Sequence, residues 1–252
     1  MPRGIRAISL DLFDTVVDLH FDRLPLAEVR GRRAPSTLPA QHAVLRERGH
    51  HVALDRFAAQ LFESDRELGA SHFQQGLEIP TLLRFQRVAE RLEIADEGLA
   101  EALTRAHMAG IASIAAAPAH HDEALGRLAG RVRLGLCSNF SHAETALAIL
   151  ERERLLRHFS ALAISETARF RKPRREIFEA LLRELEVEPE EVVHVGDRLT
   201  DDVDGAAAMG MRSAWITRRV RDPEKTLAEH PGARPTWIVS DLDELARLLD
   251  DD

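Results

Sequence analysis

The feature that most limits what this chain can fold into is a series of short apolar runs separated by helical patterns. The runs lie at residues 5–10, 132–137, 161–164, 192–195 and 213–216, with a weaker sixth at 237–239. Apolar runs of this length are typical of buried strands. Strands and helices alternate from residue 132 to the C-terminus, which indicates a parallel sheet with helices on both faces. The sequence therefore predicts a doubly wound α/β fold.

Two helices of this predicted core have clear boundaries. In residues 175–185, apolar side chains recur at helical spacing and should face the sheet: Ile177, Phe178, Leu181, Leu182 and Leu185. A second helix should run from about Asp201 to Met209, with Gly210 placed to cap its C-terminus.

Residues 17–116 have a different pattern and look inserted into the core. They read as amphipathic helical segments, and no part of them indicates a strand. Asp55 can cap one helix, and Pro80 can occupy the first turn of another. We therefore expect a core of residues 1–16 and 117–252 and a helical insert of residues 17–116, with a hinge near Ala115.

Charge and composition argue against several classes of protein. The 252 residues carry a formal net charge of −8 and no Lys/Arg-rich run, whereas binding to nucleic acid or to a membrane surface needs a concentrated basic face. The single cysteine, Cys137, cannot form an intramolecular disulfide. With no secretory signal and no long apolar stretch, the expected location is the cytoplasm.

Polar residues follow the apolar runs at the points where the predicted strands end. Asp11 follows the first run, Ser138 and Asn139 the second, and Gly196-Asp197 the fourth, while Lys172 comes shortly after the third. Ligands bind beyond the carboxyl ends of the strands in an open parallel sheet. These residues should therefore meet at one edge of the sheet.

Together these side chains can support nucleophilic substitution by a carboxylate. Asp11 can attack phosphorus or carbon and form a covalent intermediate. Attack on an anionic substrate needs positive charge, which Lys172 and a divalent cation held by Asp11 and Asp197 would supply. Hard oxygen ligands favour magnesium. Ser138 and Asn139, with nearby backbone N–H groups, could hold the oxygens of a phosphoryl group.

Lysine usage gives a separate indication. Of the 34 basic residues, only Lys172 and Lys225 are lysines. A compact ammonium and a flat guanidinium are not interchangeable, so a site that needs the ammonium would keep lysine in an arginine-rich chain.

Four segments, in order, resemble the motifs of the haloacid dehalogenase-like hydrolase superfamily. They are Asp11-Leu-Phe-Asp-Thr-Val, Cys137-Ser-Asn, Arg171-Lys-Pro and Gly196-Asp-Arg-Leu-Thr-Asp-Asp. The resemblance covers most of the chain and implies a Rossmann-like core, with residues 17–116 as a helical cap. It also implies hydrolysis of a small phosphorylated metabolite with Mg²⁺ as cofactor.

The resemblance implies roles for individual residues. Asp11 would be the nucleophile, oriented by Thr15, with Lys172 steadying nucleophile and substrate and Ser138 binding the phosphoryl group. Magnesium would be held by Asp11, the backbone carbonyl of Phe13 and Asp197, with Asp202 supporting Lys172 or the metal shell and Asp201 as a possible substitute for it.

Phe13 departs from the pattern of phosphatases that resemble this chain. Those phosphatases usually carry an aspartate at this position, which protonates the leaving oxygen and later activates water. A phenyl ring can do neither, and the loss of a general acid lowers the rate by about 10²–10⁴-fold. Asp14 is no obvious replacement, because strand alternation points it elsewhere. Four outcomes stay open: substrates with good leaving groups such as acyl phosphates, 2-haloacid dehalogenation, an acid supplied by the cap, or phospho-ligand binding without turnover.

Other polar residues have structural interpretations. Cys137 should be a small buried hydrophobe, and His194 a core histidine with its hydrogen bonds satisfied. The pairs His50-His51 and His120-His121 lack zinc-site spacing and are interpreted as surface residues. Arg33, Arg84 and His20 are candidates to contact substrate from the insert. The expected assembly is a monomer or a homodimer.

Overall fold

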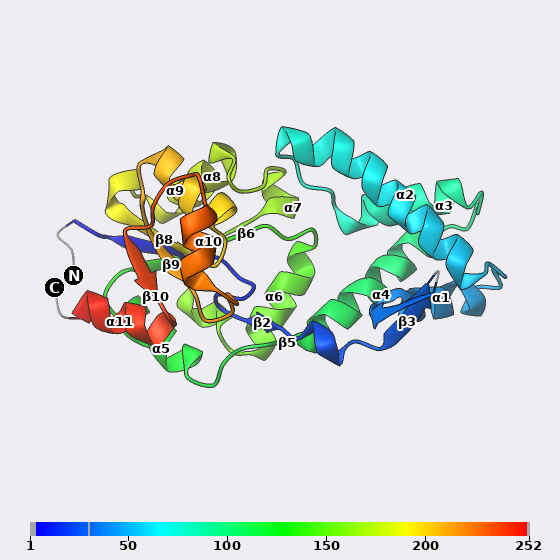
Figure 1. Cartoon of the computed structure of the whole chain (residues 1–252), viewed down its shortest axis with the longest axis horizontal. Coiled ribbons are helices and arrows are strands. Elements are labelled where there is room, and N and C mark those ends of the chain that lie inside the picture. The colour runs from blue at the N-terminus through cyan, green and yellow to red at the C-terminus, as the bar shows by residue number, and fades with distance from the viewer. Residues whose placement is uncertain (1–3, 30, 251–252) are drawn as a thin grey trace.

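Six parallel strands form the central sheet of the computed structural model, which describes residues 4–29 and 31–250 (Figure 1). The strands are β1 (Ala7–Leu10), β6 (Arg133–Ser138), β7 (Ala161–Ile164), β8 (Val192–Gly196), β9 (Arg212–Ile216) and β10 (Trp237–Val239). They lie in the order β10-β9-β8-β1-β6-β7, so the chain moves outward from β1 through β6 to β7 and then returns to pair β8 with the other side of β1. This reversal is the topological switch point at which open α/β sheets bind ligands.

Helices cover both faces of this sheet. Ile8 and Leu10 of β1 pack in one apolar cluster with α5 (His121–Ala129), α6 (Ala143–Arg152) and α11 (Leu242–Asp250). Ala7 points to the opposite face, where α8 (Arg175–Leu185) and α9 (Asp204–Met209) pack, as the two-residue period of a strand requires. The predicted α/β fold is confirmed, and the predicted apolar stripe of residues 175–185 is buried.

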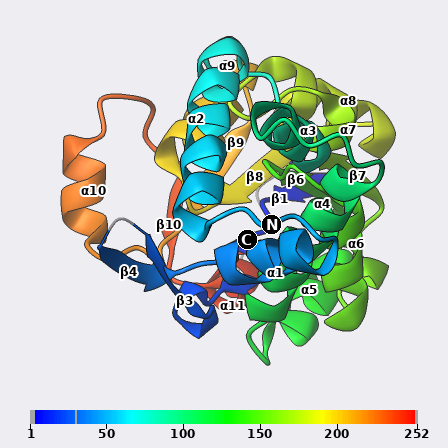
Figure 2. The same cartoon turned by 90° about the vertical axis from the view of Figure 1, so that its right-hand side faces the viewer.

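The insert has an apolar core of its own. Its helices are α1 (Leu38–Glu47), α2 (Leu54–His72), α3 (Thr81–Arg91) and α4 (Leu99–Ile114), which Figure 2 shows from the end of the molecule that they form. Phe57, Phe85 and Leu103 are fully buried between them. The stripes predicted from the sequence therefore pack helix against helix.

The expectation that residues 17–116 contain no strand is wrong. β3 (Leu26–Val29) and β4 (Arg32–Pro35) form an antiparallel hairpin, and β2 (Asp18–Leu19) pairs with β5 (Ala115–Ala116) where the chain enters and leaves the insert. β4 is exposed along its whole length. Strands this short and this polar leave no apolar run or clear alternation in the sequence.

Two predicted helix starts shift by a residue or two. Ala53 is the N-cap of α2, so Asp55 lies in the first turn instead of capping it. Pro80 is the N-cap of α3 and precedes its first turn. The helix predicted from Asp201 begins as a π-helical turn, Leu199–Val203, which leads into α9, and Gly210 caps α9 with a φ of 80° as predicted.

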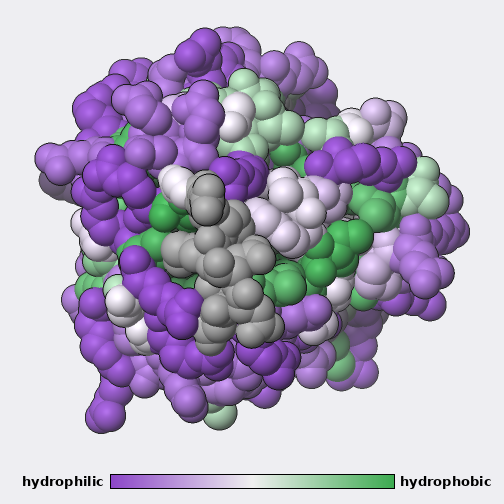
Figure 3. All heavy atoms as spheres, turned by 90° about the vertical axis from the view of Figure 1, so that its left-hand side faces the viewer, coloured by the Kyte–Doolittle hydropathy of each residue, from purple (hydrophilic) through white to green (hydrophobic). Residues whose placement is uncertain are grey.

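The remaining elements are short. They are α7 (Ser165–Ala168), α10 (Pro223–Glu229) and 3₁₀ turns at Phe21–Arg23, Phe73–Gln75, Leu156–His158 and Pro189–Glu191. No helix in the described part of the chain is long and apolar enough to cross a bilayer. The end of the core remote from the insert is largely hydrophilic, with a smaller apolar area beside the residues drawn in grey (Figure 3).

His121 corrects the interpretation of the His120-His121 pair as surface residues. Its side chain is fully buried, with Nδ1 2.8 Å from the carbonyl oxygen of Val16 and Nε2 2.7 Å from Asp241 Oδ1. His120 Nε2 lies 2.9 Å from the other oxygen of Asp241. Adjacent histidines can therefore meet one carboxylate, because His121 begins α5 and turns inward while His120 precedes the helix.

Candidate active site

Asp11 lies at the switch point, directly after β1. Its backbone N–H donates to the carbonyl oxygen of Val195 in β8 at 2.8 Å, so it is fixed between two central strands. The chain then turns sharply, with the Leu12 carbonyl accepting from both Val16 and Val17 at 2.9 Å and Asp14 at a φ of 56°. This turn leaves the Asp11 carboxylate at the head of the strand, beside a cavity of about 300 Å³.

Lys172 connects Asp11 to Asp202. Its Nζ lies 2.7 Å from Asp11 Oδ1 and 2.6 Å from Asp202 Oδ1, and only 4% of the residue is exposed. Asn139 holds the Lys172 backbone from both sides, accepting from its N–H at 2.7 Å and donating to its carbonyl at 3.0 Å. The loop after β6 therefore sets the position of the ammonium group.

Asp202 is held by partners on every side. Its Oδ2 accepts from the backbone N–H of Arg198 at 2.9 Å, and its Oδ1 lies 3.0 Å from His194 Nε2. A Cβ on Gly196 would lie only 2.1 Å from Asp202 Cγ, so a glycine is required at this place. Asp202 is thus the ion-pair partner of Lys172, and the supporting role that the resemblance implies for it stays a prediction.

Two of the predicted residues have buried hydroxyls that make no hydrogen bond with the described residues. These are Ser138 Oγ and Thr15 Oγ1. Ser138 lines the cavity, whereas Thr15 is fully buried and does not. An unpaired buried hydroxyl costs free energy, so Ser138 is suited to donate to an oxygen of a ligand in the cavity.

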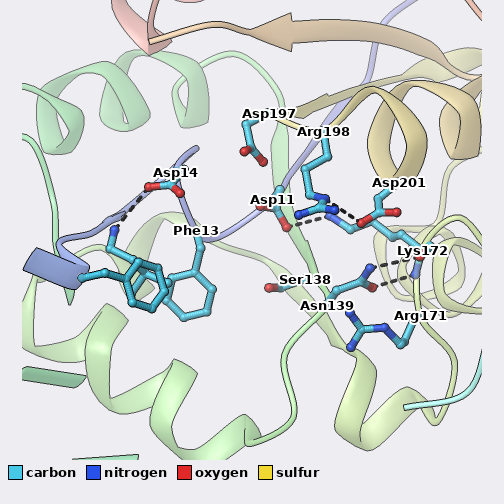
Figure 4. Close-up of a pocket in the computed structure, with 12 residues that line it drawn as sticks. Asp11, Phe13, Asp14, Ser138, Asn139, Arg171, Lys172, Asp197, Arg198 and Asp201 are labelled. Carbon is cyan, nitrogen blue, oxygen red and sulfur yellow. Dashed lines mark hydrogen bonds and ion pairs between the residues drawn. The ribbon is translucent and has the colours of Figure 1, made fainter. Parts of the chain in front are cut away.

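The predicted residues Asp11, Phe13, Ser138, Asn139, Lys172 and Asp197 all line this one cavity (Figure 4). Figure 4 shows Asp14 and Phe13 on one side of Asp11 and Lys172 on the other. Asp14 Oδ1 accepts from the Leu19 N–H and pairs with Arg219, so its carboxylate is held away from Asp11. Asp14 lines the cavity as well, with its carboxylate engaged by these partners. That it is no obvious replacement for an acid at Phe13 stays a prediction.

Leu19, Phe21, Arg171 and Arg198 also line the cavity and were not predicted as site residues. Leu19 and Phe21 belong to the insert, and no motif marks them. Arg171 directly precedes Lys172 in its motif, and this adjacency is the signal that could have found it. It forms an ion pair with Glu78 of the insert at 2.5 Å.

The carboxylates of the cavity strongly perturb one another. Burial and the negative charges of Asp11 and Asp202 raise the pKa of Asp197 to about 8. Burial raises the pKa of Asp11 to about 6, although Lys172 opposes this shift. Burial alone would lower the pKa of Lys172, but Asp11 and Asp202 outweigh it and hold that pKa well above its ordinary value. The cavity therefore has more negative charge than Lys172 can balance, a pattern typical of functional sites.

Two structural interpretations from the sequence are confirmed. Cys137 is fully buried, and burial raises the pKa of its thiol to about 12, which makes it inert. His194 is also fully buried, with Nδ1 2.8 Å from Ser9 Oγ and Nε2 facing Asp202. Burial lowers the pKa of this imidazole, so a neutral ring lies behind Asp202.

Comparison with known proteins agrees with this arrangement. A family model described as haloacid dehalogenase-like hydrolase matches residues 5–210. The chain belongs to the haloacid dehalogenase-like hydrolase family. Relatives of this hydrolase include proteins named as phosphatases and as a nucleotidase. The hydrolase is 30% identical to the pyrimidine 5'-nucleotidase YjjG of Escherichia coli (strain K12) over 66% of its own length and 69% of that protein.

Another relative of the hydrolase is the glyceraldehyde 3-phosphate phosphatase of Methanothermobacter thermautotrophicus. The two are 30% identical over 46% of this chain, and the match spans about half (51%) of that relative. Among solved structures, a 2-haloacid dehalogenase from Pseudomonas syringae pv. Tomato DC3000 superposes with a TM-score of 0.70. That match covers 98% of this chain and 99% of the other at 20% identity, which shows a shared fold.

Proposed function

We propose that this hydrolase is a magnesium-dependent phosphatase that acts on a small phosphorylated metabolite through an aspartyl-phosphate on Asp11. One observation carries the proposal. Lys172 holds a single oxygen of the Asp11 carboxylate, at the edge of a cavity that is also lined by Ser138 and Asp197. A nucleophile, a donor for phosphoryl oxygens and a second carboxylate therefore share one space.

The residues of the cavity fit a divalent cation. Asp11 and Asp197 supply hard oxygen ligands of the kind that Mg²⁺ prefers. The pKa of Asp197 is raised by burial and by neighbouring anions, so a cation there would relieve a repulsion that the protein itself leaves unbalanced. Asp11, the Phe13 carbonyl and Asp197 would hold the ion, which would offset the charge of the phosphoryl group. In this proposal Asp202 does not bind the ion itself and acts on the site through its ion pair with Lys172.

The protein's own residues account for positioning and charge in both steps. The Asp11 carboxylate attacks phosphorus, the bond from phosphorus to the leaving oxygen breaks, and the leaving oxygen takes the electron pair. Lys172 and Ser138 stabilise the negative oxygens of the phosphoryl group. Water then attacks phosphorus, which releases inorganic phosphate and restores Asp11. The buried Asp202 keeps Lys172 charged and in place during both steps.

Phe13 shapes the choice of substrate. Its ring packs edge to face on Phe140, with centroids 4.8 Å apart, and lines the cavity together with Leu19 and Phe21. This wall offers no proton to a leaving group. We therefore expect faster release from phosphates with good leaving groups, such as acyl phosphates, than from alkyl phosphates.

The same wall supports a second candidate function, 2-haloacid dehalogenation. In that reaction Asp11 attacks carbon, and halide departs with the bonding electrons and needs no proton. The dehalogenase hypothesis predicts halide release from 2-chloropropionate without added metal. Absence of halide release would remove this candidate. The second carboxylate in the cavity, Asp197, favours the phosphatase because with Asp11 it offers oxygen ligands for a divalent cation.

Several broader expectations stay predictions. The names of the relatives above favour phosphate esters as substrates. We propose that the insert acts as a cap over the site, because Leu19 and Phe21 line the cavity. A cytoplasmic location and a monomeric or homodimeric state rest on the sequence alone.

The test is phosphate release from a broad panel of phosphoesters and acyl phosphates, with Mg²⁺ or with EDTA. We expect metal-dependent release that Asp11→Asn abolishes, with Asp22→Asn, a change at an exposed aspartate, as the matched control. If no substrate responds and Asp11→Asn equals wild type, the proposal is wrong. A third possibility, binding without turnover, predicts that a phosphorylated ligand raises Tm and is recovered intact.

A further inference from the structure

A second cavity adjoins the active site on the side of the insert. It has a volume of about 360 Å³ and shares Asn139 and Arg171 with the active-site cavity. Its far end is formed by Arg84 and His107, which also line a third and larger cavity inside the insert. We call the second cavity the side chamber. A substrate with its phosphoryl group beside Asp11 could extend past Arg171 into this space.

The charged groups that line the side chamber are already paired with one another. Arg84 makes a two-pronged contact with Asp65, with N to O distances of 2.5 and 2.6 Å. Arg171 pairs with Glu78, whose carboxylate also accepts from Ser165 Oγ and from the backbone N–H of Ile79. A charged group of a ligand would meet no unpaired charge of opposite sign among these residues, and a charge that loses hydration without gaining a partner is unfavourable. The chamber therefore favours an uncharged group.

His107 provides the polar recognition. Its Nδ1 lies 2.8 Å from Thr37 Oγ1 and 3.1 Å from Gln41 Nε2. Because Gln41 Nε2 also donates to Thr37 Oγ1, the threonine hydroxyl is free to donate its own proton to Nδ1. Nδ1 is then an acceptor, and the proton of the neutral ring sits on Nε2. Nε2 has no hydrogen-bond partner among residues 4–29 and 31–250, so its N–H is available to a ligand.

The charge state of His107 agrees with this role. Burial, together with the positive charges of Arg84 and His142, lowers the pKa of the ring to about 3. The ring is therefore neutral at physiological pH and does not attract an anion. Apolar walls from Phe73, Ile79 and Phe140 complete the chamber.

We propose that the side chamber binds the leaving group of the substrate, and that this group is uncharged and presents a hydroxyl or carbonyl oxygen to Nε2–H of His107. The proposal rests on the proposed phosphatase function and narrows its substrate class to phosphates whose leaving group is uncharged and about the size of a sugar. Phosphorylated carboxylates and amino acids are excluded. His107 is a specificity-determining residue in this account.

The experiment compares kcat/KM for substrates of matched size with the full-length enzyme and Mg²⁺. The matched pairs are glucose 6-phosphate with 6-phosphogluconate, and glycerol 3-phosphate with 3-phosphoglycerate. Acetyl phosphate, whose acetyl group is much smaller than a sugar, reports the phosphatase chemistry itself, because His107 does not line the active-site cavity. We expect the uncharged member of at least one pair to be preferred by about 10-fold or more, because a charge that loses part of its hydration without gaining a partner is unfavourable.

Two variants test His107 directly. Relative to acetyl phosphate, His107→Phe should lower kcat/KM for the preferred uncharged ester by about 10-fold, the value of one hydrogen bond. His107→Gln keeps an N–H donor and should retain most of the preference. His51→Phe, at an exposed histidine of the insert, is the matched control.

The outcomes separate this inference from the proposed function. If acetyl phosphate is hydrolysed but the anionic esters match or exceed the uncharged ones, the inference is overturned and the phosphatase function stands. An equal loss for acetyl phosphate and the uncharged ester in His107→Phe would also overturn it, because the residue would then be only structural. If acetyl phosphate and every ester fail with Mg²⁺, the proposed function fails, and the inference fails with it.

Discussion

The raised pKa of Asp197 makes a prediction about stability in the absence of metal. Burial and the charges of Asp11, Asp202 and Asp14 raise this pKa from 3.8 to about 8 in the folded protein. Because the folded pKa lies above the unfolded value, the protonated carboxyl is tolerated at low pH. The free energy of unfolding should then fall as pH rises from about 4 to 8. Asp197→Asn removes the charge while keeping the shape, so it should remove this loss.

The size of the effect follows from the shift. Each pKa unit corresponds to about 1.4 kcal/mol, so four units give an upper limit of about 6 kcal/mol. Asp197 is partly exposed, and solvent screening reduces the effect to an expected value of about 2 kcal/mol at pH 8. At pH 5 the two proteins should differ by less than about half of that, because most Asp197 carboxyls are protonated there in the folded wild type.

The assay is urea unfolding in EDTA at pH 5 and pH 8, for wild type, Asp197→Asn and the control Asp22→Asn. We expect Asp197→Asn to be more stable than the wild type at pH 8, by a margin at least about twice that at pH 5. Added Mg²⁺ should stabilise the wild type at pH 8 and leave Asp197→Asn almost unaffected, since the variant lacks one ligand. If the wild type and Asp197→Asn had equal free energies of unfolding at both pH values, or gained equally from Mg²⁺, Asp197 would not carry the destabilising charge that we assign to it.

Three further predictions concern the same site. Phe13→Asp places a proton donor in the cavity and should raise hydrolysis of an alkyl phosphate relative to acetyl phosphate by about 10²-fold, measured as phosphate release; no change in that ratio would contradict the role given to the aromatic wall. Gly196→Ala puts a Cβ 2.1 Å from Asp202 Cγ and should abolish activity and lower Tm, whereas a wild-type Tm would show that the close approach is relaxed. Lys172→Met removes the ion-pair partner of two buried carboxylates, so the free energy of unfolding, measured in urea at pH 8, should fall by about 3–5 kcal/mol. The loss should be smaller at pH 5, because the pKa of Asp11 is about 6 and its carboxyl is then mostly protonated. A loss that does not depend on pH would point to packing instead.

Much of the core could be predicted because its signal is local. Each strand is a short, largely apolar run, and polar residues follow the strands that end at the ligand-binding edge. The approach of Asp11, Ser138 and Lys172 then follows from the parallel topology and does not require knowledge of side-chain contacts. The order of the strands and of the polar residues along the sequence was therefore enough to predict that these three residues lie close together.

What could not be predicted depends on contacts between distant or polar segments. The β3–β4 hairpin has charged side chains and no apolar run. His121 is buried because Val16 and Asp241, far away in the sequence, surround it. The state of His107 is set by Thr37 and Gln41 on another helix of the insert. The sequence named Arg84 as a candidate, but no pattern revealed that Asp65 neutralises it.

The central claim is that Asp11 becomes phosphorylated during turnover. The most direct measurement is mass spectrometry of peptides after the enzyme is mixed with acetyl phosphate and Mg²⁺ and quenched in acid. We expect a phosphoryl group on the peptide that contains Asp11, formed only with Mg²⁺ and absent in Asp11→Asn. Phosphate release at the wild-type rate by Asp11→Asn, with no phosphorylated Asp11 peptide in either protein, would contradict it.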